Sequence, residues 1–354
     1  MRIARVCTVL DFGGVEKRLV NVAESCPEGV ETIFIALGKG GWASQKIELL
    51  GKQVICLEED FKIPNVSLIV TLVKLFKKLK PDVVHTSGAE ANFHAQLAAY
   101  IARIPKRISE EIGFPNHNRG YRFIFKYIYS LSDKVICISA SVANKVIGLR
   151  EATREKISVV YNPIKYKEFK RDNEEQRDRI RFVTVCRLDK IKNLDRFIRV
   201  FSTLVESGSN CELIIVGDGP EKGALTDLTK ELYLEDNIKF VGFSNEPSSF
   251  LLNSDFFVLP SYSEGLGNAI MEAMLTGLPC IVSEVGGGVE LVEEGVNGWL
   301  LNPHSESNIL EKLNLALSID AVAAKKMGER SQELLKTNFS PKVHWEKLMS
   351  LYTA

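Results

Sequence analysis

Short apolar runs alternate with longer amphipathic segments along almost the whole chain, and this alternation limits the possible folds more than any other feature. Each short run fits a buried strand, and each longer segment repeats its apolar residues at helical spacing. The clearest helix carries Ile69, Leu72, Phe76 and Leu79 on one face and ends before Pro81. Strands and helices that alternate in this way predict an α/β fold with doubly wound parallel sheets.

The alternation occurs twice, with a break between the two halves. The segment 161–164, which contains a proline, and the charged run 165–181 interrupt it. Because 354 residues are enough for two domains, we expect an N-terminal domain over 1–163 and a C-terminal domain over 164–340. Two such domains in series would face each other across a cleft, with ligands beyond the carboxyl ends of the strands.

The predicted elements follow the same rule in both halves. In the first half, strands are expected at Ile3–Leu10, Thr32–Leu37, Val54–Leu57, Val83–Thr86, Arg107–Ser109, Lys134–Ile138 and Ile157–Val160. In the second half, strands are expected at Phe182–Cys186, Glu212–Val216, Lys239–Val241, Phe256–Leu259 and Cys280–Ser283. The helices of the second half are expected at Leu194–Ser207, Glu221–Leu232, Ala269–Thr276, Ile309–Leu317 and Pro341–Tyr352, and 295–300 is expected to be a turn.

Charge is divided unevenly, although the whole chain is neutral. Residues 1–170 carry 26 Lys and Arg against 17 Asp and Glu, a net charge of +9, and the remainder carries 19 against 28, a net charge of −9. A basic half suits a membrane surface, a nucleic acid or an anionic substrate. The cysteines form no CxxC pair, the N-terminus has no signal-peptide pattern and no apolar run is long enough to span a membrane, so we expect a cytoplasmic protein.

The segment around the strand that ends at Pro260 carries the strongest functional signal. A glycine-rich turn follows this strand, and a helix begins near Ala269. Glu264 stands before the turn, and Glu272 lies within the helix. The free N–H groups of a helix N-terminus suit phosphate, whereas carboxylates accept hydrogen bonds from hydroxyl groups. A sugar nucleotide offers both kinds of group.

Further candidates follow the other strands of the second half. Arg187 and Lys192 come after its first strand, where they form either a diphosphate site or an exposed loop pair. Gly217 and Gly219 end the next strand, where they serve a ligand or only a tight turn. Another strand ends near Phe243, whose backbone is a weak candidate for holding a base.

The first strand of the chain is followed by Gly13-Gly14, which open a helix and allow close approach of a phosphate or a sugar. This is not the dinucleotide fingerprint GxGxxG, so a nicotinamide cofactor is not indicated, and a P-loop is also absent. In their order along the chain, these motifs resemble the GT4 family of retaining glycosyltransferases, which have the GT-B fold of two Rossmann-like domains. The resemblance covers most of the chain and is strongest over residues 183–301.

The resemblance implies a role for each motif. Arg187 and Lys192 would bind the donor diphosphate. Glu264 would orient the transferred sugar, and Glu272 would accept hydrogen bonds from the ribose. The last helix, within residues 341–354, would cross back onto the first domain. The remaining donor-binding positions would be Gly13, Gly14, Gly217, Phe243, Gly265, Leu266, Gly267 and Asn268.

One position departs from a pattern common in this family. Many members carry a His after a strand of the N-terminal domain, where it contacts the donor sugar. Glu110 occupies roughly that place here, so Glu110 is the remaining catalytic candidate and no catalytic His is assigned. His117, in the loop that follows, is either an acceptor-binding residue or a solvent-exposed side chain. His85 either faces the cleft or is buried with a partner, and His94 is expected to be structural.

The reaction implied is transfer of a hexose-type sugar from a nucleotide diphosphate sugar, UDP favoured over GDP, to a glycan or lipid-linked glycan in cell-surface polysaccharide synthesis. Side-chain and helix charges would stabilise the departing diphosphate, so neither a metal nor a cofactor is expected. A nucleotide-sugar epimerase on the same fold is the alternative, and its own acid and base residues are not apparent. A nucleic-acid partner is not expected, because no helix-turn-helix, RRM or zinc signature occurs.

The acceptor is expected to meet the basic half. Lys74, Lys77, Lys78 and Lys80 form one cluster, and residues 121–129 mix aromatic with cationic side chains. Such a mixture suits a membrane–water interface, or the aromatics fill the domain core while the lysines are solvated. The first alternative predicts peripheral contact with an anionic membrane at its inner face.

Overall fold

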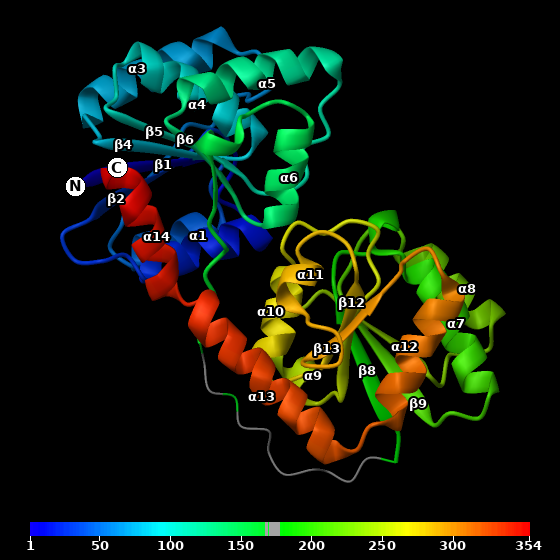
Figure 1. The fold of residues 1–354 in the computed structure, drawn as a ribbon. Helices are drawn as coiled ribbons and strands as arrows, with labels where there is room; N and C mark the ends of the chain where they lie inside the picture. The colour runs from blue at the N-terminus through cyan, green and yellow to red at the C-terminus, as the bar shows by residue number, and fades with distance from the viewer. Residues whose placement is uncertain (167–168, 170–177) are drawn as a thin grey trace. The chain divides into compact units, whose positions relative to one another are not determined.

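Apart from residues 167–168 and 170–177, the computed structural model describes the whole chain, which divides into two compact units (Figure 1). Unit 1 comprises Met1–Lys165 and Phe339–Ala354, and unit 2 comprises Tyr166–Asn338. Most of the charged run expected at the domain boundary lies outside the described residues.

Unit 1 contains a seven-stranded parallel sheet in the order β3-β2-β1-β4-β5-β6-β7, and the chain reverses its direction of travel across the sheet beside β1, as in doubly wound folds. The strands are β1 (Arg2–Cys7), β2 (Glu31–Ala36), β3 (Gln53–Cys56), β4 (Val83–Ser87), β5 (Lys106–Glu111), β6 (Lys134–Cys137) and β7 (Ile157–Val159). The helices are α1 (Gly14–Glu24), α2 (Trp42–Leu49), α3 (Val66–Leu79), α4 (Ala89–Ile101), α5 (Arg119–Leu131), α6 (Ala140–Gly148), the 3-10 turn η1 (Arg154–Lys156) and α14 (Pro341–Thr353).

Helices cover both faces of this sheet (Figure 1). On one face, α3 and α4 pack on β1, β2 and β4, and Phe76 is fully buried there. On the other face, Trp345 and Leu348 of α14 join Ile3 and Val83 in a second apolar cluster. The C-terminal helix is therefore part of the core of unit 1.

Unit 2 contains a six-stranded parallel sheet in the order β10-β9-β8-β11-β12-β13. The strands are β8 (Ile180–Val185), β9 (Cys211–Val216), β10 (Ile238–Gly242), β11 (Phe256–Leu259), β12 (Cys280–Ser283) and β13 (Gly298–Leu301). The helical elements are the 3-10 turn η2 (Lys190–Lys192), α7 (Leu194–Glu206), α8 (Lys222–Glu231), α9 (Ser248–Leu252), α10 (Asn268–Leu275), α11 (Gly288–Leu291), α12 (Glu306–Ser318) and α13 (Ala321–Asn338).

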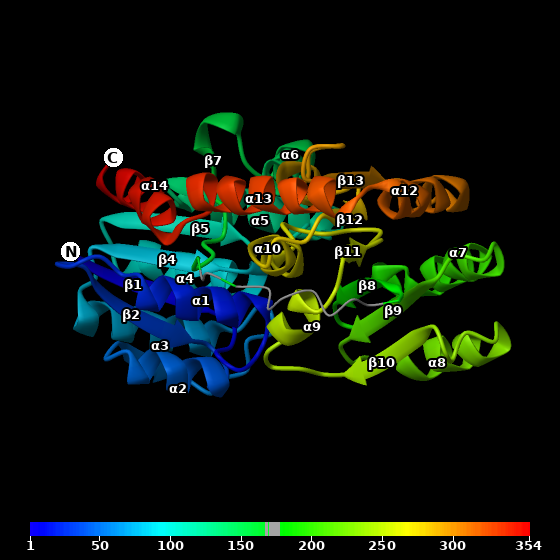
Figure 2. The same cartoon turned by 90° about the horizontal axis from the view of Figure 1, so that it is seen from below.

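One large apolar cluster joins α7, α8 and α12 to this sheet. Figure 2 shows β8, β9 and β10 side by side at one end of the sheet. Helices α10 and α13 pack on each other through small residues. Gln332 Nε2 of α13 donates to the Leu275 carbonyl of α10 at 2.9 Å, and a Cβ on Gly328 would overlap the backbone of Gly277. These contacts fix the position of α10 in unit 2, and the predicted donor-binding residues lie at its N-terminus and in the turn before it.

The expected strands and helices are present, with ends that differ by a few residues, but strand β13 and helices α9, α11 and α13 of unit 2 were not predicted. Residues 295–300 were expected to be a turn, because a glycine such as Gly298 is typical of turns. Strand β13 occupies the second half of this segment. This glycine is instead required by packing, since a Cβ there would overlap the Cys280 carbonyl of β12. Helix α13 could not be predicted from an apolar stripe, because its buried residues are Gly328, Ser331 and Leu335.

Candidate functional site

The predicted residues of unit 2 come together at one edge of its sheet. All strand pairs are parallel, so their carboxyl ends share an edge. Arg187 follows β8, Gly217 follows β9, Phe243 follows β10 and Glu264 follows β11. In open parallel sheets this edge is where ligands bind.

Lys192 and Glu264 form an ion pair at this edge, with 2.7 Å between Nζ and Oε2. Their side chains are only 17% and 19% exposed. Burial alone would lower the pKa of Lys192, but the Glu264 carboxylate outweighs it and raises this pKa above its usual range. Lys192 is therefore a fixed positive charge that already has one anionic partner.

The loop that carries Lys192 is tied to the strand beside it. Asn193, a buried residue in the left-handed conformation (φ 56°), donates from Nδ2 to the carbonyls of Pro260 at 3.1 Å and Pro303 at 2.9 Å. The Tyr262 N–H donates to the Ile191 carbonyl at 2.8 Å. A role for Asn193 was not predicted from the sequence. An Asn directly before the helical pattern of α7 is a feature that could have indicated it.

The turn before α10 is built by close backbone packing. Gly267 has φ +87°, and a Cβ on Gly287 would stand 2.5 Å from Leu266 Cα. The Gly287 N–H donates to the Glu264 carbonyl at 3.2 Å. Gly265, Leu266, Gly267 and Asn268 thus form a compact backbone turn that leads into the N-terminus of α10.

Arg187 and Gly217 lie at the neighbouring strand ends. A Cβ on Gly217 (φ +148°) would overlap the Cys186 carbonyl, so only glycine fits between β8 and β9 there. The Leu188 N–H donates to the Asp218 carbonyl at 2.9 Å. The Arg187 side chain is exposed and has no hydrogen bond or ion pair with the residues that the structure describes.

The remaining donor candidates of unit 2 are accessible in part. Glu272 lies one turn beyond Asn268 on α10 and is half-buried. Phe243, after β10, is 59% exposed. The edge therefore offers two cations, the largely buried Lys192 and the exposed Arg187, together with a helix N-terminus and the carboxylates of Glu264 and Glu272.

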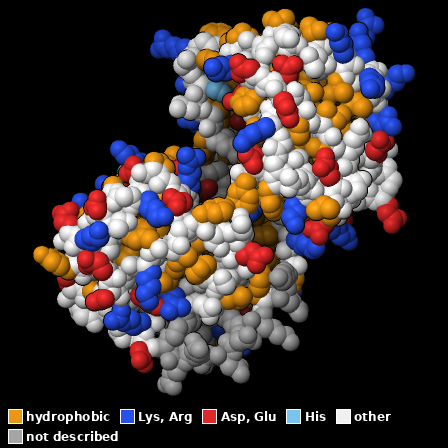
Figure 3. All heavy atoms as spheres, turned by 180° about the vertical axis from the view of Figure 1, so that it is seen from behind, with side chains coloured by type: hydrophobic (Ala, Val, Ile, Leu, Met, Phe, Trp, Pro, Cys, Tyr) orange, Lys and Arg blue, Asp and Glu red, His pale blue; other side chains and the backbone are white. Residues whose placement is uncertain are grey.

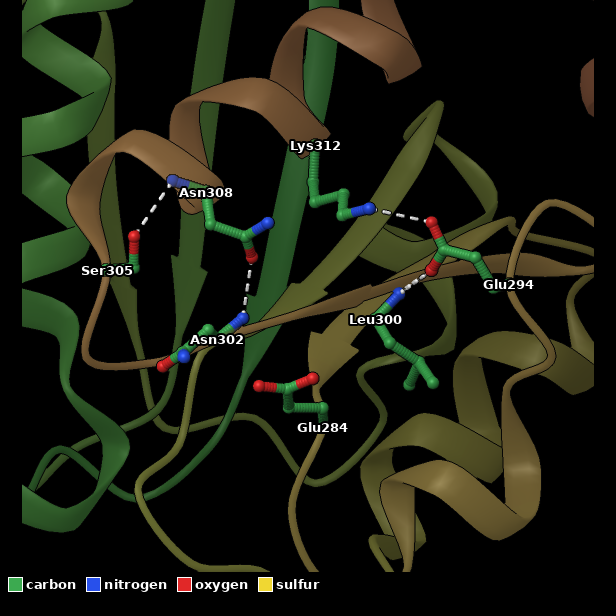
Figure 4. A pocket seen from close by; sticks show the side chains of 7 residues that line it. All are labelled: Glu284, Glu294, Leu300, Asn302, Ser305, Asn308 and Lys312. Carbon is green, nitrogen blue, oxygen red and sulfur yellow. Dashed lines mark hydrogen bonds and ion pairs between the residues drawn. The ribbon is translucent and has the colours of Figure 1, made fainter.

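A pocket of about 480 Å³ lies elsewhere in unit 2, beside β13 and α12 (Figure 4). Several of its polar groups pair with one another. Lys312 pairs with Glu294 at 2.7 Å, and the Asn302 N–H donates to Asn308 Oδ1 at 2.7 Å. None of the predicted site residues lines this pocket, so its size alone does not mark it as the site.

In unit 1, Gly13 caps α1 and Gly14 is its first residue, at the carboxyl end of β1. The same helix carries Arg18, which is 3% exposed and points into the unit. Sequence reasoning missed Arg18. It could have been found as a charged residue within the apolar face of α1, beside Leu19 and Val22.

Glu110 is fully buried at the end of β5. Arg18 Nη1 donates to its Oε1 at 2.5 Å and Nη2 to its Oε2 at 2.9 Å, while Ser87 Oγ donates to Oε2 at 2.6 Å. The Arg5 guanidinium and His85 Nε2 lie 3.5 and 3.4 Å from Oε2. Burial alone would raise the pKa of Glu110, but Arg18, His85 and Arg5 hold it well below its usual range. Both oxygens are engaged inside the unit.

The three histidines of unit 1 that were weighed as candidates, His85, His94 and His117, have distinct environments. His85 is buried, and its Nδ1 lies 2.6 Å from the Tyr352 hydroxyl of α14. His94 is also buried, and its Nε2 accepts the Asn65 N–H that begins α3. His117 is partly exposed, and its Nδ1 lies 2.9 Å from Glu151 Oε1. His85 and His94 are thus structural, and His117 alone of these reaches the surface.

The aromatic segment of α5 divides between core and surface. Phe125 and Tyr129 are buried, whereas Phe123 and Tyr127 are 77% and 57% exposed. The core alternative therefore holds for Phe125 and Tyr129, and contact of the exposed aromatics with a membrane stays a prediction. In the described part of the chain, none of the helices is both long and apolar enough to span a membrane.

Two family models match the chain in succession. The model described as Glycosyltransferase Family 4 matches residues 12–168, and the model described as Glycosyl transferases group 1 matches residues 165–334. The capsular polysaccharide biosynthesis glycosyltransferase CapM of Staphylococcus aureus is 26% identical over 320 residues, which are 84% of each chain. An Escherichia coli UDP-Gal:alpha-D-GlcNAc-diphosphoundecaprenol alpha-1,3-galactosyltransferase is 29% identical over 273 residues, 71% of this chain and 70% of that protein.

Solved structures share the whole architecture. Anabaena HepE in complex with UDP superposes with a TM-score of 0.85 at 21% identity over 100% of both chains. The lipopolysaccharide outer core galactosyltransferase WaaB superposes with a TM-score of 0.80 at 20% identity over 99% of both. With parallel sheets in both units and successive family matches from residue 12 to residue 334, the chain belongs to the family 4, group 1 glycosyltransferases and has their GT-B fold.

Proposed function

We propose that this glycosyltransferase moves a hexose or N-acetylhexosamine from a nucleotide diphosphate sugar, with retention of configuration, to a glycan or lipid-linked glycan. The observation that carries the proposal is the Lys192–Glu264 ion pair beside the N-terminus of α10. It combines a cation for phosphate, a carboxylate for sugar hydroxyls and backbone N–H groups at one edge of the sheet.

Such a site would act mainly by stabilising the negative charge of the departing diphosphate. As the donor bond breaks, negative charge grows on the diphosphate, where Lys192, the exposed Arg187 and the α10 N-terminus would stabilise it. A diphosphate oxygen would take the acceptor proton on the same face, which leads to retention. Glu264 would orient the sugar, and Glu272 would accept hydrogen bonds from the ribose. Because side chains and the helix supply positive charge, the proposed reaction needs no divalent metal and no cofactor.

The donor and the pathway are proposed from the relatives. HepE has been crystallised with UDP and with UDP-glucose, which supports a UDP-sugar over a GDP-sugar. CapM is named for capsular polysaccharide biosynthesis, and the Escherichia coli relative is named for an acceptor on diphosphoundecaprenol. These names support a role in cell-surface polysaccharide synthesis with a lipid-linked acceptor.

A donor panel tests the reaction. UDP-glucose, UDP-galactose, UDP-GlcNAc and GDP-mannose are compared by thermal shift, and the preferred donor is then incubated with GlcNAc-diphosphoundecaprenol. We expect UDP-sugar binding, slow UDP release without acceptor, and a product whose anomeric proton shows the configuration of the donor. An inverted product would exclude retention. Conversion of one nucleotide sugar into its epimer, without transfer, would instead support the epimerase alternative.

Peripheral membrane contact through α3 and α5 is the further part of the proposal. Figure 3 shows hydrophobic, basic and acidic side chains interspersed on one face of the molecule. Helices α3 and α5 themselves carry only basic charges, those of Lys74, Lys77, Lys78, Arg119, Arg122 and Lys126. Such a surface suits anionic lipid at the inner face of a membrane.

Vesicle sedimentation tests this contact. The protein should sediment with phosphatidylglycerol vesicles at low salt but not with phosphatidylcholine vesicles, and Phe123→Ser with Tyr127→Ser should weaken the binding. Tyr233→Ser is the matched control, because Tyr233 is 89% exposed but lies in unit 2. Absence of binding at low salt would exclude the membrane contact while leaving the transfer reaction untouched.

A further inference from the structure

His117 is held more firmly than a residue of a surface loop needs to be. Its Nδ1 lies 2.9 Å from Oε1 of Glu151, whose side chain is fully buried. Its ring stacks on Phe125, with the centroids 4.1 Å apart and the planes 14° apart, and Tyr121 lies on a nearly parallel plane at 6.3 Å. Arg122 Nε donates to the His117 carbonyl at 3.1 Å. Backbone, ring plane and ring rotation are therefore all fixed.

The Glu151 contact also fixes which nitrogen is the acceptor. A carboxylate only accepts hydrogen bonds, so a neutral His117 ring carries its proton on Nδ1 and leaves a lone pair on Nε2. The side chain is 11% exposed, and Nε2 is not among the enclosed side-chain atoms that lack a partner. Within the described residues no group bonds to Nε2. The protein thus presents a prepared hydrogen-bond acceptor to solvent.

The location of this nitrogen suits a substrate. His117 lies in the loop between β5 and α5, so it follows the carboxyl end of a strand, at the edge of the unit 1 sheet where Gly13-Gly14 also lie. Tyr121 beside it is 38% exposed, and an exposed aromatic face packs well against a sugar ring. Phe123 lies further along α5 and is 77% exposed.

We propose that His117, with its tautomer set by Glu151, accepts a hydrogen bond from a hydroxyl of the sugar acceptor, whose ring packs on Tyr121. His117 positions the acceptor and takes no part in proton transfer to the diphosphate. The inference rests on the proposed function, because it assigns the acceptor subsite of the proposed transfer.

Two measurements test the proposal on the full chain. In ¹⁵N-histidine NMR at pH 8, the neutral His117 ring should carry its proton on Nδ1, and its Nε2 resonance should move when octyl glycosides of glucose, galactose or GlcNAc are added. In kinetics with GlcNAc-diphosphoundecaprenol, His117→Ala should raise the acceptor KM about three- to tenfold, the worth of one neutral hydrogen bond. Donor KM and donor hydrolysis should not change.

Conservative variants distinguish binding from structure. His117→Gln places an amide oxygen near the position of Nε2, so it should restore most of the acceptor affinity that His117→Ala loses. Asn116→Ala, in the same loop, is the control and should leave the acceptor KM unchanged. A proton on Nε2 at pH 8, or an Nε2 resonance that none of the glycosides moves, would overturn the inference. If the wild type ignores GlcNAc-diphosphoundecaprenol, the proposed acceptor is wrong, and the NMR result still decides the role of His117.

Discussion

Lys192 Nζ lies 2.7 Å from Oε2 of Glu264, and this pair joins the loop after β8 to the turn before α10. Lys192→Ala should lower kcat about 10²- to 10³-fold, because it removes a preorganised charge from the growing diphosphate anion. UDP release and product formation with the preferred UDP-sugar give kcat directly.

Lys192→Arg keeps the charge and is the matched control, which should retain a measurable part of kcat. The melting temperature of both variants must be measured, because Lys192→Ala also leaves Glu264 without its partner. A normal kcat in a folded Lys192→Ala protein would remove Lys192 from the proposed mechanism.

Arg187 offers a cleaner substitution, since its exposed side chain forms no hydrogen bond or ion pair with the described residues. Arg187→Ala should leave the melting temperature unchanged and lower kcat/KM for the UDP-sugar about 10²-fold. Uridine, which lacks the diphosphate, should bind the variant and the wild type equally in a calorimetric titration. An equal loss of affinity for uridine and UDP would show that Arg187 does not act on the diphosphate.

The sequence predicted the fold well because alternation of strands and helices is a local pattern. The site residues of unit 2 were found for a related reason: each lies in the segment that follows a predicted strand, and parallel strands bring their carboxyl ends to one edge. Arg187, Lys192, Gly217 and Glu264 all follow this rule.

Partners across the fold could not be predicted in the same way. Nothing near Glu110 in the sequence indicates that Arg18, 92 positions away, holds both of its oxygens. The bond between His117 and Glu151 joins residues 34 positions apart, so the choice between a solvent side chain and a fixed one needed the structure. Strand β13 was missed because Gly298, which close packing against β12 requires, is also typical of a turn. Helix α13 was missed because the small Gly328 and Ser331 on its buried face leave no apolar stripe.

Gly217 gives a test of backbone packing at the site. Gly217→Ala should destabilise unit 2 by about 1–3 kcal/mol or more, because φ is +148° and the new Cβ would overlap the Cys186 carbonyl. Urea unfolding followed by the fluorescence of Trp299, which is buried in this unit, measures the loss. Gly223→Ala, on α8 with open space around its Cα, should instead be neutral or stabilise the protein by up to about 1 kcal/mol. Equal effects of the two changes would contradict the packing argument.

Glu110, the catalytic candidate of unit 1, is buried and paired with Arg18, and the consequence for stability is measurable. Glu110→Gln should destabilise unit 1 by about 3–5 kcal/mol, because it leaves two buried guanidinium groups, those of Arg18 and Arg5, without their carboxylate. Arg18→Met added to Glu110→Gln should recover part of the stability, since it removes one of the unpaired charges. A Glu110→Gln protein with normal stability and a large loss of kcat would instead support direct contact between Glu110 and the sugar.

The buried histidines of unit 1, His85, His94 and His344, make its stability depend on pH, since burial lowers the pKa of each. Burial, aided by Arg5, lowers the pKa of His85 to about 4 and that of His344 to about 3. Because both values lie below the ordinary value near 6.5, their contribution to folding is complete above that pH and is lost as the pH falls toward 4 and 3. For His85 the contribution is on the order of 3 kcal/mol. Glu111 acts in the opposite direction, because burial raises its pKa to about 7 and its contribution is lost as the pH rises through that value.

Thermal unfolding between pH 8 and pH 4 tests this balance. Stability should fall steeply below pH 6.5, and His344→Gln should reduce the slope, because glutamine can donate to the Tyr161 carbonyl as Nδ1 does but does not titrate. His304→Gln is the control, since His304 is exposed in unit 2 and its removal should leave the slope unchanged. If His344→Gln leaves the acid slope as steep as in the wild type, the loss of stability comes from other groups, and the paired carboxylate of Glu110 would be the next to test.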